Sequence, residues 1–264
     1  MDDSLAGVVL AAGAGRRLAP LTRLRPKALC PVGGQPLVDR AVARIEPHVG
    51  DVAVNLHHGA AALHAHLDPR LHRSFEAPEA LGTAGALGAL RPWLAGRDVL
   101  LTNSDAWFPD DLDLGAFVAG WDGDRVRLLC VDDPVRGDFG RARYCGVALL
   151  PARLVARLEA TPSGLYEVQW RAEALEGRLD LVVHPGGFVD CGTPADYLRA
   201  NLAASGGASV VGAGARVHPG ATVVRSVVWD GAEVAAGEVL VDAVRAGPLT
   251  VLIRGDETPI GLGT

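Results

Sequence analysis

The chain has 264 residues, of which 49% are hydrophobic and 21% are charged, with a formal net charge of -6 at neutral pH. This composition excludes intrinsic disorder as the main state, and it excludes a broad basic surface for nucleic acid or anionic membranes. The first apolar run, 5–15, is far too short to span a membrane, and Asp2 and Asp3 stand where a signal peptide would be basic. We therefore expect a cytoplasmic protein in which any phosphate site is built locally.

Basic residues and cysteines are both distributed informatively. Of the 25 basic residues, 24 are Arg, and the single Lys is Lys27. Since arginine serves wherever a generic positive charge suffices in this chain, Lys27 is a candidate for chemistry. The four cysteines lie far apart without C-x-x-C spacing, which predicts reduced thiols instead of disulfides or zinc ligands.

Short apolar runs alternate with segments of helical period from residue 5 to about residue 203. This alternation predicts βαβ units and an α/β fold with a mixed, mostly parallel sheet. The expected strands are 7–12, 51–56, 98–103, 126–131, 144–150, 179–184 and 188–191. The expected helices are 37–45, 60–67, 83–90 and 167–175, followed by one that Pro194 opens at its first turn.

The periodicity changes after a linker at 204–209. Aliphatic residues then recur every six positions, with a single five-residue step, at Val211, Val217, Val223, Val228, Val234 and Leu240. This hexapeptide period predicts a β-helix of about two coils. Because so small a solenoid leaves coil edges and an apolar face uncovered, we expect it to dock on the preceding domain or on a second subunit. The predicted parts are a domain at 1–204, the β-helix at 208–253 and a C-terminal tail at 254–264.

Two glycines follow the first predicted strand, in Gly13-Ala14-Gly15, and allow backbone amides to wrap an anion. The loop is not a Walker motif, because no Gly-Lys-Ser/Thr follows at the required spacing. It is also a poor dinucleotide fingerprint, since Leu18 occupies the third glycine position and Asn55 stands where a ribose-binding acid would be. Neither common phosphate-binding motif accounts for this loop.

A longer motif includes the loop and the single lysine. From Leu10 to Lys27 the chain reads L-A-A-G-A-G-R-R-L-A-P-L-T-R-L-R-P-K, and P-V-G-G-Q-P-L follows shortly after. This stretch resembles the signature L-A-(A/G)-G-x-G-x-R-L-x-P-L-T-x-x-x-P-K of the sugar-1-phosphate nucleotidyltransferases. Its motifs are most like those of mannose-1-phosphate guanylyltransferases and N-acetylmuramate 1-phosphate uridylyltransferases.

The resemblance covers essentially the whole chain and implies an enzyme. The implied reaction transfers a nucleoside monophosphate from an NTP to a sugar 1-phosphate, giving an NDP-sugar and pyrophosphate. The implied fold is a Rossmann-like catalytic domain at 1–204 with a short left-handed β-helix at 208–253. The expected partners are NTP and sugar 1-phosphate, with no nucleic acid and no membrane, and the β-helix is a candidate surface for homo-oligomers.

Four charged residues would carry this chemistry, which brings two polyanions together and needs charge neutralisation and in-line positioning. Arg17 would bridge the β and γ phosphates, and Lys27 would place a compact charge between the reacting phosphates. Asp105, in an N-S-D motif, and Asp190, in D-C-G-T-P, resemble the family's metal ligands. Together they are expected to hold Mg²⁺.

Binding residues are assigned around these four. For the nucleotide they are Leu10, Ala11, Ala12, Gly13, Gly15, Arg17, Glu76, Gly82, Thr83 and Asn103, and for the sugar they are Gly146, Glu167 and Arg143. Many relatives carry Glu-Lys-Pro, whose lysine holds the sugar phosphate, where this chain reads Asp132-Asp133-Pro134. We expect Arg136, Arg141 or Arg143 to supply the missing charge.

For the base and the sugar, the sequence leans to GTP with mannose 1-phosphate, and UTP with N-acetylmuramate or glucose 1-phosphate is the alternative. Glu76 and Glu79 precede the L-G-T-A-G turn and could accept the two adjacent donors of guanine, which favours GTP with mannose 1-phosphate. The L-A-A-G start and the G-D-F-G at 137–140 favour UTP with N-acetylmuramate or glucose 1-phosphate. A third possibility is a non-catalytic paralogue that binds a nucleotide sugar and regulates a partner, against which the retention of all four charged residues argues.

Overall fold

The computed structural model describes residues 4–109 and 112–253, and the predicted C-terminal tail at 254–264 lies outside the described residues. The chain divides into two compact units. Unit 1 comprises Met1–Ala14, Pro26–Cys30 and Pro36–Val189. Unit 2 comprises Gly15–Arg25, Pro31–Gln35 and Asp190–Thr264.

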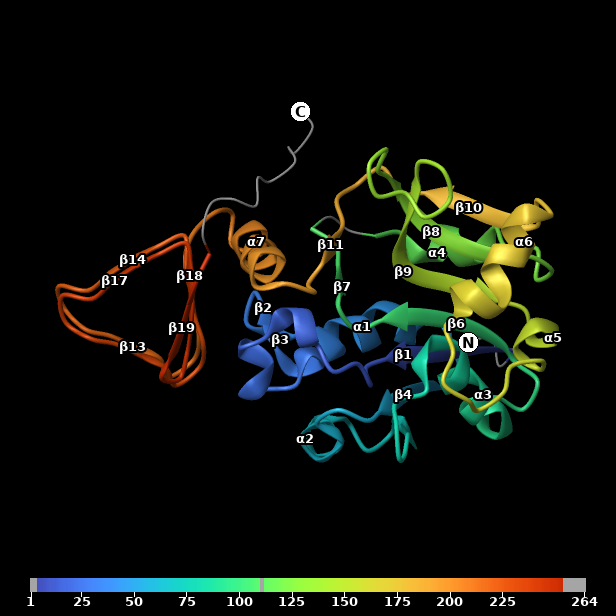
Figure 1. Cartoon of the computed structure of the whole chain (residues 1–264), viewed down its shortest axis with the longest axis horizontal. Coiled ribbons are helices and arrows are strands. Elements are labelled where there is room, and N and C mark those ends of the chain that lie inside the picture. The colour runs from blue at the N-terminus through green and yellow to red at the C-terminus, as the bar shows by residue number, and fades with distance from the viewer. Residues whose placement is uncertain (1–3, 110–111, 254–264) are drawn as a thin grey trace. The chain divides into compact units, whose positions relative to one another are not determined.

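Unit 1 is built on a seven-stranded sheet with the order β10-β8-β9-β6-β1-β4-β5 (Figure 1). The strands are β1 (Leu5–Leu10), β4 (Val52–Leu56), β5 (His72–Phe75), β6 (Asp98–Asn103), β8 (Val126–Asp132), β9 (Ala142–Leu150) and β10 (Leu179–Val183). Every neighbouring pair is parallel except the two that β9 makes with β6 and β8. The prediction of a mixed, mostly parallel sheet is therefore confirmed.

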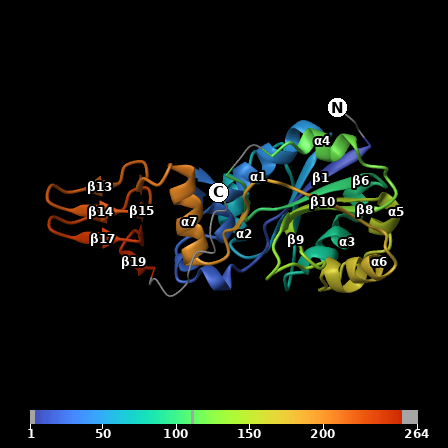
Figure 2. The same cartoon turned by 90° about the horizontal axis from the view of Figure 1, so that it is seen from above.

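Helices cover both faces of this sheet, as Figure 2 shows with α1 and α4 on one side and α3 and α6 on the other. They are α1 (Leu37–Ile45), α2 (Ala60–His66), α3 (Gly82–Leu94), α4 (Leu114–Ala119), α5 (Ala152–Val155) and α6 (Arg171–Leu175), which continues a π-helical turn at Tyr166–Trp170. The expected helices at 37–45, 60–67 and 167–175 match closely, whereas α3 runs on through Pro92 to Leu94.

Alternating side chains along the strands make two hydrophobic cores, one on each face. On β1, for example, Val9 packs with α1, α2 and α4, while Val8 packs with α3 and α5. Because successive strand residues point to opposite faces, runs that are apolar throughout are needed where both faces are covered. This explains why the sequence of the central strands is continuously apolar.

Unit 2 contains α7 (Pro194–Ala204) and a series of short strands after it. They are β12 (Val210–Val211), β13 (Arg216–Val217), β14 (Thr222–Val224), β15 (Val227–Val228), β16 (Glu233–Val234), β17 (Val239–Val241), β18 (Ala243–Ala246) and β19 (Leu249–Leu252). The remaining short strands of the chain are β2 (Pro31–Val32), β3 (Gln35–Pro36), β7 (Ala106–Trp107) and β11 (Val189–Asp190).

The short strands from β12 to β18 pair in parallel with a constant offset, whereas β19 pairs antiparallel with β18. Val210 lies opposite Val227, Val217 opposite Val234, and Val227 opposite Val244, so each partner lies 17 residues further along the chain. Two six-residue steps and one five-residue step give this same offset. Of the aliphatic residues that repeat in the sequence, Val228, Val234 and Leu240 are buried together, whereas Val211 and Val217 are 50% and 40% exposed.

Trp229 anchors these strands on α7 within unit 2. Its Nε1–H donates to the Tyr197 hydroxyl at 3.0 Å, and Tyr197 is fully buried. The Arg25 guanidinium stacks over the Trp229 ring at 4.7 Å and donates to Asp230 at 2.9 Å. These short strands are therefore attached to α7 of the same unit by the Tyr197–Trp229 pair and by Arg25.

Within residues 4–109 and 112–253, no helix combines the length and the apolar character that crossing a bilayer requires. The four cysteines are all buried. Burial raises the pKa of the Cys130 thiol to about 12, with Asp138 adding a smaller contribution. This thiol therefore stays protonated at neutral pH, as expected for a core residue.

Candidate active site

The strand order of unit 1 reverses next to β1. The chain passes from β1 to β4 and β5 on one side and then crosses to β6 on the other. In open α/β sheets ligands bind outside the carboxyl ends of the strands at such a switch point. The segment that follows β1 and the segment that follows β6 meet here, because the Ser104 N–H donates to the Leu10 carbonyl at 3.0 Å. Both segments carry predicted site residues.

Lys27 and Asp105 are brought together at this edge. The Lys27 ammonium donates a short hydrogen bond to the Asp105 carboxylate, and the two side chains are 12% and 27% exposed. A half-buried ion pair is less screened by water than a surface one. The single lysine of the chain is therefore held in a defined place beside the turn that follows β6.

Arg44 fixes that turn, a role the sequence analysis missed. Its guanidinium donates to the Thr102 hydroxyl at 2.9 Å and to the Ala106 carbonyl at 2.6 Å, on both sides of Asp105. The Phe108 ring lies under the same guanidinium at 4.9 Å. In the sequence Arg44 is one more arginine on an amphipathic helix, so no signal distinguished it.

Glu76 belongs to a buried network that joins two predicted nucleotide-binding segments. The Ala11 N–H donates to the Asn55 side-chain oxygen at 2.6 Å, and the Asn55 amide donates to Glu76 Oε1 at 2.7 Å. Glu76 Oε2 accepts from the Leu81 N–H at 2.7 Å, and only 5% of Glu76 is exposed. Both carboxylate oxygens thus accept from protein donors, and Glu76 ties the loop after β1 to the start of α3.

Gly82 and Thr83, at the start of α3, have local structural roles. Gly82 has a φ of +70°, and a side chain there would lie 2.5 Å from the Ser163 carbonyl oxygen. The Thr83 hydroxyl accepts from the Leu165 N–H at 2.8 Å. The turn therefore packs tightly on the segment that leads to the π-helical turn.

Gly13 and Gly146 are glycines for different reasons. A side chain added at Gly13 would meet nothing in the protein, and this residue has no left-handed φ. Gly146 has a φ of +81°, and an added Cβ would lie 3.0 Å from the Cβ of Ala106 and 3.1 Å from that of Asn103. Packing explains Gly146, whereas no neighbour among the described residues accounts for a glycine at position 13.

Substituting these two glycines by alanine should separate the two roles. Gly13→Ala should leave the free energy of unfolding unchanged and lower kcat/KM by about 10- to 100-fold, because a methyl group would displace the nucleotide. Gly146→Ala should destabilise the protein by about 1–3 kcal/mol through left-handed strain and the clash with Asn103. Denaturant unfolding and steady-state kinetics of both variants measure this. A fully active Gly13→Ala enzyme would exclude ligand contact at that position.

The predicted sugar-binding residues lie on β9 and on the π-helical turn of unit 1. Glu167 is exposed on that turn, and its carboxylate folds over Gly164, where an added Cβ would lie 2.0 Å from Glu167 Oε2. The Tyr144 and Trp170 rings join β9 to the turn in an edge-on contact at 4.9 Å. Burial above all raises the pKa of Tyr144 well beyond its usual range, and the nearby Asp105 charge adds to this. The Tyr144 hydroxyl is therefore neutral at physiological pH.

Arg17 and Asp190 form a pair within unit 2. Arg17 Nη2 donates to Asp190 Oδ2 at 3.2 Å, with the two side chains 68% and 27% exposed. A Cβ at Gly192 would lie 2.8 Å from Arg17 Nη2 and 2.9 Å from Asp190 Oδ1. The glycine of D-C-G-T-P thus leaves room for the pair. Gly15 begins the 3-10 turn that carries Arg17, with a φ of 59°.

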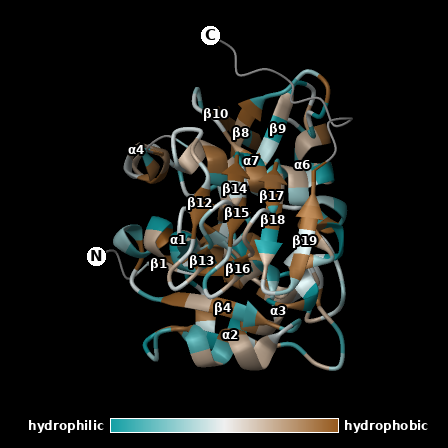
Figure 3. Ribbon diagram, turned by 90° about the vertical axis from the view of Figure 1, so that its left-hand side faces the viewer, coloured by the Kyte–Doolittle hydropathy of each residue, from teal (hydrophilic) through white to brown (hydrophobic). Residues whose placement is uncertain are grey.

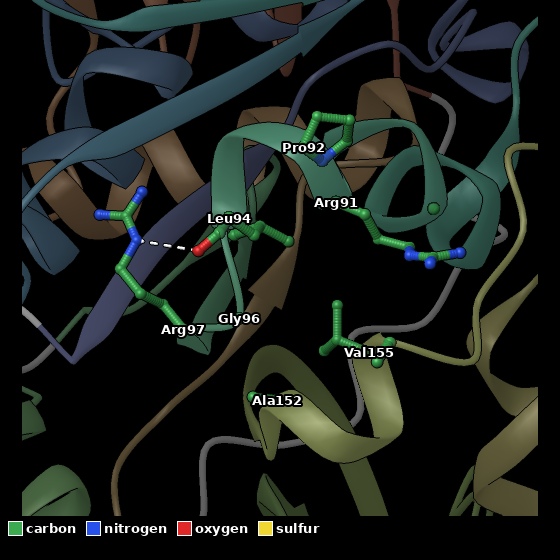
Figure 4. Close-up of a pocket in the computed structure, with 9 residues that line it drawn as sticks. Arg91, Pro92, Leu94, Gly96, Arg97, Ala152 and Val155 are labelled. Carbon is green, nitrogen blue, oxygen red and sulfur yellow. Dashed lines mark hydrogen bonds between the residues drawn. The ribbon is translucent and has the colours of Figure 1, made fainter.

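Unit 1 has a hollow of about 460 Å³ (Figure 4) near the start of β6, whereas Asp105 follows the end of that strand. It is lined by the end of α3, by Gly96 and Arg97 just before β6, and by α5 just after β9. The start of β6 and the end of β9 pair at the amino edge of the parallel strands. Arg97 at its rim donates to the Leu94 carbonyl at 3.0 Å, drawn as a dashed line, and to Asp51 at 3.0 Å. These bonds use the arginine structurally, and the hollow is at the wrong edge for the predicted chemistry.

No group of three or more His, Cys, Asp or Glu side chains that could hold a metal ion occurs in the part of the chain that the structure describes. Such groups are typical of zinc sites. Mg²⁺ is different, because it is usually bound by one or two carboxylates together with substrate phosphates and water. The absence of such a group therefore does not bear on the Mg²⁺ expected at Asp105 and Asp190.

Known proteins share both the sequence and the fold. The MobA-like NTP transferase domain matches residues 7–176. The N-acetylmuramate alpha-1-phosphate uridylyltransferase of Caulobacter vibrioides is 30% identical in an alignment of 228 residues. The match covers 73% of this chain and 94% of that protein. The bifunctional protein GlmU of Methanococcus maripaludis is 26% identical over 74% of this chain, which spans only 53% of GlmU.

A solved structure from Thermus thermophilus, named mannose-1-phosphate geranyltransferase, has the same fold with a TM-score of 0.71. It is 18% identical and covers 95% of each chain. The α/β nucleotidyltransferase fold with its mostly parallel sheet is thus common to both. On the extent of the domain match and the length of the Caulobacter alignment, the chain belongs to the MobA-like NTP transferase family and is a sugar-1-phosphate nucleotidyltransferase.

Proposed function

We propose that the enzyme transfers the uridylyl group of UTP to N-acetylmuramate 1-phosphate, releasing pyrophosphate. The observation that carries this proposal is the 30% identity to the Caulobacter uridylyltransferase over 94% of that protein. The motif L-A-A-G after β1 and the G-D-F-G at 137–140 support the same choice. Glucose 1-phosphate is the second sugar of this type to be tested.

In the sequence, two acidic residues before the turn at the start of α3 favour GTP with mannose 1-phosphate. Glu76 no longer supports guanine, because both oxygens of its buried carboxylate accept hydrogen bonds from Asn55 and Leu81. Glu79 is exposed in the same segment and remains available to two adjacent donors. GTP therefore stays in the test as the second nucleotide.

The charged residues divide the proposed reaction between them. An oxygen of the sugar 1-phosphate attacks the α-phosphorus of the NTP, and pyrophosphate leaves. Lys27, compact and half-buried against Asp105, suits the crowded place between the reacting phosphates. Arg17 presents a solvent-accessible fork of donors, which suits the departing pyrophosphate. Backbone amides around Gly13 would support the triphosphate.

Mg²⁺ would take carboxylate oxygens from Asp105 and Asp190. When bound it would supply charge neutralisation to the phosphates. Within its own unit each of these carboxylates is held by a cation, Asp105 by Lys27 and Asp190 by Arg17. Each proposed metal ligand is thus paired with a residue that we propose to touch the phosphates.

The decisive experiment is a pyrophosphate-release assay on the purified full-length chain with the four common NTPs. Each is combined with N-acetylmuramate, N-acetylglucosamine, glucose and mannose 1-phosphate. The proposal expects UTP with N-acetylmuramate 1-phosphate to have the highest kcat/KM. A preference for GTP with mannose 1-phosphate would replace the proposed substrates, and no turnover with any pair would overturn the proposed function.

We further propose that residues 208–253 form a short left-handed β-helix appended to a catalytic domain at 1–204. The 17-residue offset of its parallel strands supports a coil of three short strands. Val224, Val239 and Val241 are at least 40% exposed on β14 and β17, which Figure 3 shows as hydrophobic. Such a flat apolar face supports self-association of the β-helix.

Truncation after Ala204 should lower the melting temperature. The deletion removes Trp229 and uncovers Tyr197, which is fully buried in the complete chain. For a chain of this size each kcal/mol of lost stability lowers the melting temperature by about 2–4 °C. Calorimetry measures this loss, and sedimentation compares the oligomeric state. If the melting temperature and the oligomeric state both stay as in the complete chain, the residues after Ala204 contribute neither to stability nor to self-association.

A further inference from the structure

Arg143 lies at the same sheet edge as Lys27 and Asp105. β9 runs antiparallel to β6, and their pairing ends where Thr102 lies opposite Val147. The first residues of β9 therefore extend past the carboxyl end of β6. There Arg143 lies opposite Val131, at the carboxyl end of β8. This edge is where the second substrate must meet the NTP.

Three arginines follow the Asp132-Asp133 pair, and only one of them is shielded from water. Arg141 donates to Asp132 at 2.8 Å with a side chain that is 67% exposed. Arg136 donates to Asp133 at 3.0 Å and is 51% exposed. The side chain of Arg143 is only 18% exposed. A charge in that position attracts an anion with less screening than the other two.

The Arg143 guanidinium lies over an aromatic ring, and the carboxylate with which it pairs already accepts other hydrogen bonds. The guanidinium carbon lies 5.4 Å from the centre of the Phe188 ring, while Nη1 is 3.4 Å from Asp133 Oδ2. Asp133 also accepts from the N–H groups of Val135 at 3.1 Å and Arg136 at 2.9 Å. Although burial raises the pKa of Asp133, these hydrogen bonds lower it overall. The bond from Arg143 is the longest that Asp133 accepts.

This arrangement fits a phosphate monoester. A guanidinium that lies over an aromatic ring is held in place, and its planar fork can offer two parallel donors to two phosphate oxygens. We propose that Arg143 binds the phosphate of the sugar 1-phosphate, with Phe188 and Asp133 as positioning residues. The inference rests on the proposed function and adds the residue that recognises the attacking group.

The test compares Arg143→Gln with the control Arg153→Gln, a half-exposed arginine of α5 that pairs with Asp124, in the full-length enzyme. Arg143→Gln should raise the KM for the sugar 1-phosphate about 10- to 100-fold, the range for losing a charge-assisted hydrogen bond, and leave the KM for the NTP unchanged. Arg143→Lys should recover part of the loss, because it keeps the charge without the planar fork. Arg153→Gln should have wild-type constants. An unchanged KM for the sugar 1-phosphate in Arg143→Gln would overturn the inference.

A second part of the test asks whether Arg143 binds the phosphate or the other anionic group that the proposed sugar carries. N-acetylmuramate 1-phosphate has a lactyl carboxylate that N-acetylglucosamine 1-phosphate lacks. A phosphate contact weakens both sugars by the same factor in Arg143→Gln. A loss confined to the lactyl sugar would overturn the inference and assign Arg143 to the carboxylate.

Direct binding keeps this test independent of the proposed reaction. Calorimetry measures the affinity of each sugar 1-phosphate for wild type and Arg143→Gln, both saturated with a non-hydrolysable UTP analogue. Weaker binding to the variant is expected whether or not turnover occurs. If wild type binds a sugar 1-phosphate but turns over no pair, the proposed function fails and the inference stands. If both proteins bind equally, or neither binds, the inference fails.

Discussion

Lys27→Arg should lower turnover about 100-fold, although it keeps the positive charge, since misplacing a reacting group by about 1 Å can cost that much in rate. The Lys27 side chain is only 12% exposed and its ammonium is seated on Asp105. A guanidinium is broader and planar, so it cannot occupy the same place without moving Asp105 or the phosphates. The other 24 of the 25 Lys and Arg residues are arginines. If Lys27 supplied only positive charge, Lys27→Arg would therefore leave turnover unchanged.

The measurement is kcat beside nucleotide affinity for Lys27→Arg, Lys27→Ala and the control Arg23→Lys. Arg23 lies exposed in the preceding loop, and its exchange should change neither quantity. Nucleotide affinity should fall much less than kcat in both Lys27 variants, because Arg17 and the loop amides are expected to carry most of the triphosphate. Near-normal turnover of Lys27→Arg would show that the single lysine is an accident of composition.

The sequence predicted the central strands of unit 1 better than its edge elements. β1, β6 and β8 are buried on both faces, so they read as continuous apolar runs. β5 is an edge strand with the sequence H-R-S-F and has no apolar period, so it was missed. The short helices α4 and α5 were missed as well, since few residues give no helical period to read.

The same contrast holds for the candidate site, where motif residues could be predicted and the residues that hold them in place could not. Lys27 and Asp105 were found because motifs carry them, and the structure pairs them. The residues that hold the site, Arg44 and Asn55, act through hydrogen bonds to positions 44 to 62 residues away in the chain. Such long-range bonds depend on strand register, which no local pattern encodes. Glu76 was noticed for its charge, but only the fold revealed that its carboxylate is buried and engaged.

Asp105→Asn and Asp190→Asn should each lower turnover by about 100-fold or more while the protein stays folded. Asparagine preserves the size of the side chain but removes the charge that a divalent cation and the neighbouring Lys27 or Arg17 require. The control is Asp51→Asn, which alters an exposed partner of Arg97 just before β4, at the amino edge of the sheet. That variant should keep full activity.

Mg²⁺ titration decides whether these losses concern the metal or only the paired cations. If the carboxylates bind Mg²⁺, each variant needs a higher Mg²⁺ concentration for half-maximal rate, and a chelator abolishes wild-type turnover without lowering the melting temperature. If they only orient Lys27 and Arg17, the rates fall but the half-saturating Mg²⁺ concentration stays the same. Full wild-type activity in the chelator would remove the metal from the proposal. The two ion pairs would then carry the phosphate chemistry alone, which a dianionic acceptor attacking a triphosphate makes physically demanding.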